Sequence, residues 1–142
     1  MITEKPRTFV DLVVPGVPTP KGRPRLGNGH TFTPARTRTA EELMGWAMKQ
    51  ACPEGPLQGP LVLYVKFLFA MPESWTEKRK GAAYKTCHVG RPDRDNLVKL
   101  VKDAGNGILW RDDSLIWQLC ANKLWADVSE TWITVSRQAR EL

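Results

Sequence analysis

The stretch from Leu61 to Phe69 limits the possible folds more than any other part of this 142-residue chain. It contains no glycine or proline, and every second position is large and apolar: Leu61, Leu63, Val65, Phe67 and Phe69. Side chains two positions apart lie on the same face of a β-strand, so the pattern predicts a strand with one fully apolar face. The residues between them are Val62, Tyr64, Lys66 and Leu68. They are also mostly apolar, which predicts a central and largely buried strand.

Two segments have the apolar spacing of helices. Thr39 and Glu42 form a capping-box pattern that predicts the start of a helix, and this helix should end before Pro53. Its expected apolar face consists of Leu43, Trp46, Ala47 and Ala51. A second helix is predicted from Asp95 to Ala104, where apolar residues recur every three or four positions: Leu97, Leu100, Val101 and Ala104.

Three more segments have strand patterns: Thr8 to Val14, Leu115 to Trp125 and Thr131 to Val135. We expect the last two to form an antiparallel pair, joined around Asp127 to Glu130. Together with the helices they give the order β-α-β-α-β-β, which predicts an α+β fold with a small mixed sheet covered by two helices. A chain of this length suits one domain, so residues 1–142 are assigned to a single domain.

The segment from Pro15 to Pro34 is rich in proline and glycine, which excludes regular structure over most of its length. We therefore expect a long loop that extends to about residue 38. Between positions 21 and 38 it has no acidic residue and five basic ones: Lys21, Arg23, Arg25, Arg36 and Arg38. Such a loop can hold DNA phosphates, and a solvated, disordered loop is the alternative.

Composition narrows the class of protein. The net charge of +6 favours polyanionic partners such as nucleic acid. The three cysteines are far apart and contain no Cys-x-x-Cys pair, which argues against a disulfide framework and against a thiolate zinc site. No apolar run approaches the ~20 residues of a membrane helix, and the N-terminus lacks the pattern of a signal peptide. We expect a soluble intracellular protein that does not act at a membrane.

Aspartates gather in the second half of the chain around the predicted second helix. Asp93 and Asp95 lie two positions apart at its start, and Lys99 follows Asp95 by one helical turn. An Asn-Gly turn after the helix is expected to return Asp112 and Asp113 to their neighbourhood. Converging carboxylates repel, so they either take up protons or bind a cation, and Mg²⁺ prefers such hard oxygen ligands. The pattern predicts metal-dependent phosphodiester chemistry; a helix cap, a surface ion pair and a turn are the alternative.

Several strings of residues in this region match one known family. They are Pro92-Asp93-Arg94-Asp95-Asn96-Leu97-Val98-Lys99, then Asp103-Ala104, Asn106-Gly107, Trp110-Arg111-Asp112-Asp113 and Ile116. Together they resemble the RusA family of Holliday junction resolvases, which is found in bacteria and is often carried by phages. Upstream, the chain is similar to phage-borne members at Val14 to Pro18, Lys21 to Arg25 and Thr33-Pro34. The family's Asp-Ala-Leu-Asn-Gly has Gly105 in place of leucine here, which is expected to weaken the last helical turn.

The resemblance implies a RusA-like, homodimeric, Mg²⁺-dependent endodeoxyribonuclease, with Mn²⁺ as an expected substitute. Such an enzyme resolves four-way junctions by paired symmetric cuts in DNA recombination and repair. It assigns metal binding and catalysis to Asp93, Asp95 and Asp113, catalysis to Lys99, and a further candidate metal ligand to Asp112. We assign DNA binding to Lys21, Arg23, Arg25, Arg36, Arg38, Arg91 and Arg94. The resemblance also implies a cytoplasmic location, in a bacterium or a phage-infected cell. The sequence has no Walker or Rossmann glycine pattern, so no nucleotide cofactor is expected.

The dimer also follows from the symmetry of the expected substrate. A four-way junction has approximate two-fold symmetry, and two cuts on opposed strands require two sites related by a similar axis. One chain offers one acidic cluster, so a monomer could make only one cut at a time.

Two other functions remain open on the sequence alone. One is a non-catalytic nucleic-acid-binding protein, and the other is a nuclease for other branched DNA, such as flaps or replication forks. His30 and His88 have no partners at zinc-ligand spacing, so a histidine-based site is disfavoured. Four tryptophans, in or near the predicted strands, are assigned to core or dimer packing rather than base stacking: Trp110, Trp117, Trp125 and Trp132.

Overall fold

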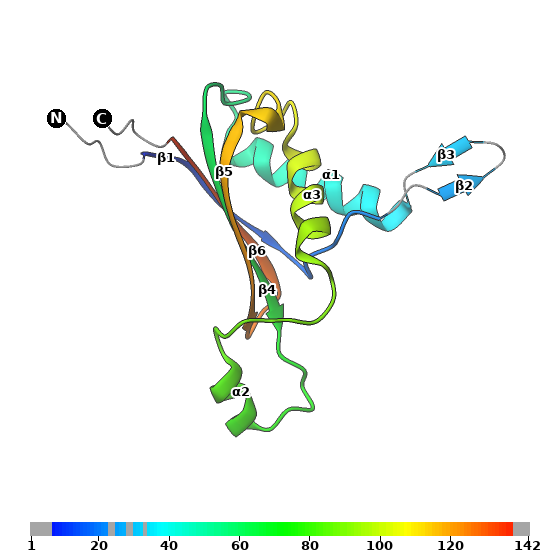
Figure 1. Cartoon of the computed structure of the whole chain (residues 1–142), viewed down its shortest axis with the longest axis vertical. Helices are drawn as coiled ribbons and strands as arrows, with labels where there is room; N and C mark the ends of the chain where they lie inside the picture. The colour runs from blue at the N-terminus through cyan, green and yellow to red at the C-terminus, as the bar shows by residue number, and fades with distance from the viewer. Residues whose placement is uncertain (1–6, 23–24, 28–29, 33, 138–142) are drawn as a thin grey trace.

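The computed structural model describes residues 7–22, 25–27, 30–32 and 34–137. Four strands form a mixed sheet in the order β1-β6-β4-β5 (Figure 1). These strands are β1 (Arg7–Pro15), β4 (Leu61–Ala70), β5 (Ile116–Ala126) and β6 (Glu130–Arg137). The central strand β4 pairs in parallel with β5 and antiparallel with β6, which in turn pairs antiparallel with β1.

Helices α1 (Ala35–Ala51) and α3 (Arg94–Gly105) both cover the same face of this sheet (Figure 1). The short helix α2 (Glu77–Ala83) lies on a projection beyond one end of the sheet. Strands β2 (Arg25–Gly27) and β3 (His30–Phe32) form a separate two-stranded unit, and the 3₁₀ turn η1 (Asp113–Leu115) precedes β5. The prediction of a small α+β domain with a mixed sheet and two covering helices is therefore confirmed. Among the described residues, no helix is long and apolar enough to cross a membrane.

The core lies between the sheet and the two helices, and β4 is at its centre. The alternate residues predicted for its apolar face are all buried: Leu61, Leu63, Val65, Phe67 and Phe69. From α3, the buried residues include the predicted Leu97, Leu100, Val101 and Ala104. The opposite face of β4 is less buried than expected, because no helix of the described residues covers it: Val62 is inaccessible, whereas Tyr64 and Lys66 are exposed.

Helix α1 differs from its prediction in its start and in its buried face. It begins at Ala35, four residues before the predicted cap at Thr39. In the first turn, the buried Thr37 accepts a hydrogen bond through Oγ1 from the N–H of Gly22 at 2.9 Å. This bond holds the first turn of the helix against the preceding segment. Because the helix begins at Ala35, Arg36 and Arg38 lie on a helix rather than in a loop.

The side of α1 that faces the core carries Met44, Gly45 and Met48, whereas Leu43 and Trp46 are exposed. Gly45 explains this orientation, because α3 and its following turn pass very close to it. A β-carbon at position 45 would lie 3.1 Å from Cδ1 of Ile108 and 3.5 Å from the carbonyl oxygen of Ala104. The helix therefore presents its smallest residue to its neighbour, which places the two larger predicted side chains in solvent.

The prediction that the last two strands pair with each other is wrong. β5 and β6 both pair with β4, which lies between them. The connection from β5 to β6 passes around the end of β4, where the N–H of Ala70 donates to Oγ of Ser129 and that of Met71 to the carbonyl of Ala126. The most apolar strand thus takes the most buried place. The predicted irregular segment also contains the β2–β3 pair, which runs antiparallel from Arg25 to Phe32.

Candidate active site

The N-terminus of α3 presents two carboxylates side by side. Asp93 is the N-cap residue, with an extended backbone, and its Oδ1 accepts a hydrogen bond from the N–H of Asp95 at 2.9 Å. Asp95 lies in the first turn, and its side chain is 83% exposed. The partial positive charge of a helix N-terminus favours carboxylates at these positions. Both groups are open to solvent and to any ligand.

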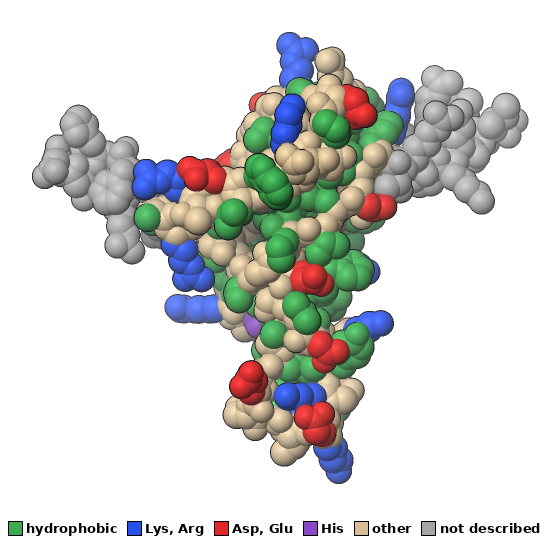
Figure 2. Space-filling view, turned by 180° about the vertical axis from the view of Figure 1, so that it is seen from behind, with side chains coloured by type: hydrophobic (Ala, Val, Ile, Leu, Met, Phe, Trp, Pro, Cys, Tyr) green, Lys and Arg blue, Asp and Glu red, His purple; other side chains and the backbone are tan. Residues whose placement is uncertain are grey.

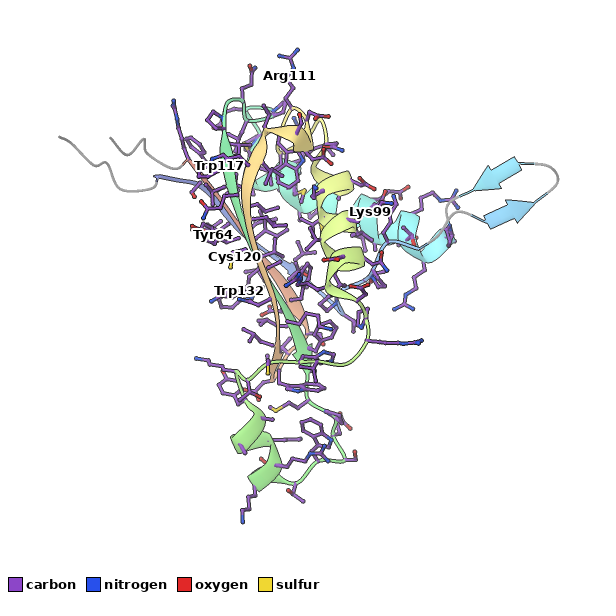
Figure 3. All side chains as sticks on the ribbon, in the orientation of Figure 1. Tyr64, Lys99, Arg111, Trp117, Cys120 and Trp132 are labelled. Carbon is purple, nitrogen blue, oxygen red and sulfur yellow. The ribbon has the colours of Figure 1, made fainter. Side chains whose placement is uncertain are left out.

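Basic side chains surround these two carboxylates. Nη2 of Arg94 lies 3.6 Å from Oδ1 of Asp95, and Arg91, just before the helix, is exposed. Lys99 is also exposed and lies one turn after Asp95. Figure 3 shows Lys99 on α3, on the other side of the sheet from Tyr64 and Trp132. The N-terminal end of α3 thus combines two acids with cations that can contact a phosphate.

Lys123 on β5 holds the segment that leads into Asp93. Its Nζ donates to the carbonyl oxygen of Pro92 at 2.7 Å, and also to that of Gly90. Sequence reasoning did not identify this residue. The available signal was a lysine at an alternate position of a predicted strand whose same-face neighbours, Ala121 and Trp125, are apolar. A cation on such a face needs buried polar partners, and here they are main-chain carbonyls.

Asp112 and Asp113 lie at the other end of α3. Asp112 caps η1, where its Oδ2 accepts from the N–H of Ser114 at 2.9 Å, and hydrogen bonds from Ser114 lower the pKa of its carboxyl group. Asp113 is half-buried and begins η1. The chain runs from the C-terminal end of α3 to η1 through Arg111. The N–H of Arg111 donates to the carbonyl of Leu57, which fixes this connection beside the start of β4.

The expectation that the turn after α3 returns these residues to Asp93 and Asp95 is therefore wrong within one chain. At a rise of about 1.5 Å per residue, α3 is roughly 18 Å long and separates the two pairs. β5 indicates the same separation: Ile116 follows η1 directly, whereas Lys123 contacts Pro92, and these strand positions lie roughly 23 Å apart. Within the described residues, no three His, Cys, Asp or Glu side chains lie close enough together to hold a metal ion.

Lys21 is not the solvated cation that its sequence context predicts. Its Nζ forms ion pairs with Glu41 on α1 and with Asp103 on α3, and its side chain is only 18% exposed. Its N–H also donates to the carbonyl of Asn96 at 2.9 Å. Burial disfavours the charge, but the hydrogen bonds that Lys21 donates to Glu41 and Asp103 outweigh it and raise the pKa of Lys21 above 10.5. Its charge is already neutralised, which argues against direct contact with phosphate.

The other candidate DNA-binding residues are placed in different ways. Arg36 and Arg38 are exposed in the first turn of α1. Arg23 lies outside the described residues, and of Arg25 only the backbone, in β2, is described.

Comparison with known proteins gives the chain a family. A family model described as Endodeoxyribonuclease RusA matches residues 15–136. The chain belongs to the RusA family. The matched region contains every aspartate described above. The chain is also 33% identical to the uncharacterized protein YqaN of Bacillus subtilis (strain 168) over 126 residues, which cover 83% of this chain and 89% of YqaN. RusA proteins are endodeoxyribonucleases, so this membership supports hydrolysis of phosphodiester bonds in DNA.

The departure from the RusA pattern at Gly105 has a structural explanation. The ring of the buried Trp110 packs directly on this glycine, and a β-carbon there would lie 2.4 Å from Cζ2 of the ring. Nε1 of Trp110 donates to Oδ1 of Asn106 at 3.1 Å and to the carbonyl of Lys102 at 3.3 Å. Gly105 therefore makes room for the tryptophan that closes the end of α3.

Two of the remaining candidates in this RusA chain, His88 and Trp110, are buried and have structural roles. His88 is buried, stacks on Phe69 and lies against Trp125, each with ring centroids 4.3 Å apart. Burial and the nearby charge of Lys123 lower the pKa of His88. Trp110 is a core residue, as expected, whereas Trp117 and Trp132 are exposed. On the face seen in Figure 2, Lys and Arg side chains are scattered among acidic and apolar ones, with no single basic patch.

Proposed function

We propose that this chain is a Mg²⁺-dependent endonuclease that resolves four-way DNA junctions by paired, symmetric cuts in recombination and repair. The observation that carries the proposal is the exposed pair Asp93 and Asp95 at the start of α3, with Lys99 one turn away, in a chain of the RusA family. Exposed acids that interact mainly with a helix terminus are free to take up a cation.

Asp93 and Asp95 suit Mg²⁺ by their chemistry. Mg²⁺ is held by one or two carboxylates, with water and substrate phosphate oxygens filling its other positions. Oδ1 of Asp93 is oriented by the N–H of Asp95, which leaves the second oxygen of Asp93 for a ligand. A divalent ion held there supplies the positive charge that a phosphodiester transition state requires. Mn²⁺ accepts the same ligands and is proposed as a substitute.

The cations around this pair have separate roles in the proposal. Lys99 projects from the same helix and offsets the charge that develops on the phosphate. Arg91, Arg94, Arg36 and Arg38 hold the DNA backbone, which fixes its position without reading sequence. Lys123 is a positioning residue, because it fixes the carbonyls of Gly90 and Pro92 immediately before Asp93.

The proposed substrate requires two such sites. Paired cuts on opposed strands of a two-fold symmetric junction need two active sites related by two-fold symmetry, and we propose a homodimer as the working unit. One chain contributes one copy of the Asp93 and Asp95 pair.

A labelled four-way junction tests the proposal. With Mg²⁺ we expect paired nicks at symmetric positions, and with a chelator none. Asp95→Asn should lower cleavage by at least about 100-fold and leave junction affinity unchanged or higher, because a negative charge is removed. Glu77→Gln on α2 is the matched control, since it removes an exposed acid far from the site. Equal cleavage by Asp95→Asn and wild type would refute the proposal.

The same assay decides between the alternatives. Tight binding without cleavage in any divalent metal indicates a non-catalytic nucleic-acid-binding protein. Equal cleavage of flaps, forks and four-way junctions indicates a nuclease of broader substrate range.

A further inference from the structure

Residues 72–90, the α2 projection, lie between β4 and α3 and hold α2 beyond one end of the sheet (Figure 1). None of the residues of α2 is buried, so this helix adds nothing to the hydrophobic core. Its contribution must therefore lie at the surface of the molecule, where it faces solvent and any ligand.

The base of the α2 projection is fixed to the end of β5. The N–H of Lys85 donates to the carbonyl of Trp125, and the N–H of Trp125 donates to the carbonyl of Thr86, both at 2.9 Å. The ring of Trp75 also packs edge-to-face with that of Trp125, with ring centroids 4.9 Å apart. The α2 projection is thus a fixed extension of the sheet and can hold a ligand in a defined place.

Three exposed cations of the α2 projection have no acidic partner among the described residues: Lys78, Arg79 and Lys85. The fourth basic residue, Lys80, pairs with Glu77 at 3.9 Å, so its charge is partly offset. Lys85 has a φ of 64°, in the left-handed region that residues other than glycine rarely adopt. Backbone strain of this kind is concentrated at binding sites, and here it falls on an exposed lysine.

Two of these cations lie over aromatic rings of the same projection. Cζ of Arg79 lies 3.9 Å from the ring centroid of Trp75, and Nζ of Lys85 lies 5.3 Å from that of Tyr84. Single-stranded nucleic acid binds by stacking its bases on free aromatic faces, but here a cation occupies one face of each ring. The α2 projection therefore offers positive charge rather than stacking, which suits the phosphate backbone of a duplex.

The α2 projection starts close to the candidate active site and leads away from it. Lys123, which fixes the segment before Asp93, lies two residues before Trp125, or about 7 Å along β5. α2 ends just before Lys85 bonds to Trp125, so its first turn, with Lys78, lies furthest out. Its seven residues add roughly 10 Å. The cations thus extend up to roughly 17 Å beyond Lys123, which is about five base pairs of duplex at ~3.4 Å each.

We propose that the α2 projection binds the phosphate backbone of the duplex arm that leads away from the cut, through Lys78, Arg79 and Lys85. This proposal rests on the proposed function, because the arm belongs to the same junction. Contacts to phosphate fix the position of DNA without reading its sequence. The α2 projection therefore holds the arm in place within about half a helical turn of the bond that is cut.

Binding of a four-way junction without divalent metal tests this contact independently of cleavage. Lys78→Gln combined with Lys85→Gln should lower the slope of log affinity against log salt by about 2. The advantage of wild type over this double variant should therefore grow about 10-fold when salt falls from 200 to 50 mM. The matched control combines Lys49→Gln with Lys66→Gln, which removes the same charge from exposed positions on α1 and on the uncovered face of the sheet. If the first double variant loses no more slope than the control, the proposal is overturned.

Neutral phosphates locate the contact on the DNA. Methylphosphonates, which carry no charge, are placed at successive positions along each arm. We expect a group of positions within about five base pairs of the nicked bond at which the replacement weakens wild-type binding at least about threefold. The double variant of Lys78 and Lys85 should lose much less affinity at these positions. Equal losses by both proteins at every position would show that the α2 projection does not contact the arm.

The two assays separate this inference from the proposed function. If both binding results are as expected but wild type cuts no junction with Mg²⁺, the proposed function alone has failed. If wild type makes paired cuts but the double variant of Lys78 and Lys85 binds like the control, the contact by the α2 projection alone is refuted.

Discussion

The Nζ of Lys21 lies 3.1 Å from Oδ2 of Asp103, so an ion pair joins the proline-rich segment to the last turn of the core helix α3. Glu41 of α1 completes the group. We expect Lys21→Met to lower the free energy of unfolding by about 1–2 kcal/mol, because two partly buried carboxylates lose their cation. Urea unfolding measures the loss, and a loss no larger than that of an exposed lysine, Lys78→Met, would contradict this role.

The same ion pair predicts a dependence on alkaline pH. The pKa of Lys21 is raised above 10.5 in the folded chain, so the unfolded chain loses this proton first. The contribution of Lys21 to stability is complete below pH 10.5 and is lost as the pH rises through the folded pKa. The difference in unfolding free energy between wild type and Lys21→Met should be constant from pH 7 to about 10 and decrease above that.

Arg36 and Arg38 should carry the DNA contacts that sequence assigned to Lys21. Each is exposed on the first turn of α1. Replacing both with alanine should weaken junction binding and reduce the slope of log affinity against log salt by about 2, since each phosphate contact contributes about 0.9. Lys21→Met is the control and should leave this slope unchanged. An unaltered slope in the double variant would remove α1 from the DNA-binding surface.

Lys123→Met should impair cleavage without impairing DNA binding. The substitution frees the carbonyls of Gly90 and Pro92, so the segment before Asp93 is no longer fixed. We expect a 10- to 100-fold loss of cleavage rate at saturating junction, as is typical for residues that orient metal ligands. Lys123→Arg should recover part of the rate and of the Mn²⁺ affinity. A purely structural role would lower stability in both variants and leave metal affinity unchanged.

Gly105→Ala should destabilise the chain by about 1–3 kcal/mol, because the added methyl group overlaps the ring of Trp110. Trp110→Phe removes the ring atoms that would collide. The double variant should therefore lose less stability than the sum of the two single variants, as measured in a thermal double-mutant cycle. Additive losses would show that the two residues do not interact.

His88 should make the chain less stable in mild acid. Its pKa is lowered below 6.5 by burial and by Lys123, so the folded chain keeps it neutral when the unfolded chain takes up a proton. Stability is therefore lost as the pH falls below about 6.5. His88→Phe keeps the aromatic stacking and should reduce this loss, measured by urea unfolding at pH 7 and pH 5.

The fold was predictable where a residue's neighbours in sequence determine its surroundings. The alternation along β4 and the spacing of apolar residues in α3 each identify one apolar face, and the structure buries that face in both elements, as predicted. The face of α1 was not predictable, because it depends on the approach of α3 to Gly45. The partners of β5 and β6 were predicted wrongly for the same reason, since the strand that lies between them comes from far away in the sequence.

The candidate site was predictable in part. The positions of Asp93, Asp95 and Lys99 relative to one another follow from a helix start, which is a local feature. The distance from Asp95 to Asp113 depends on the length of α3 and on the direction of the chain after Trp110. The role of Lys21 could not be read from its basic neighbours, because its partners Glu41 and Asp103 come from two different helices.

The crossing of the β5–β6 connection over the end of β4 also affects how the chain acquires its structure. Two strands joined by a short link usually zip together early as a local hairpin, but here they cannot, because a third strand has to enter between them. Sheet formation therefore waits for loop closure over a long span of sequence. A fragment that begins after α3 would contain both strands that flank β4 but not β4 itself, and would have nothing to hold them together.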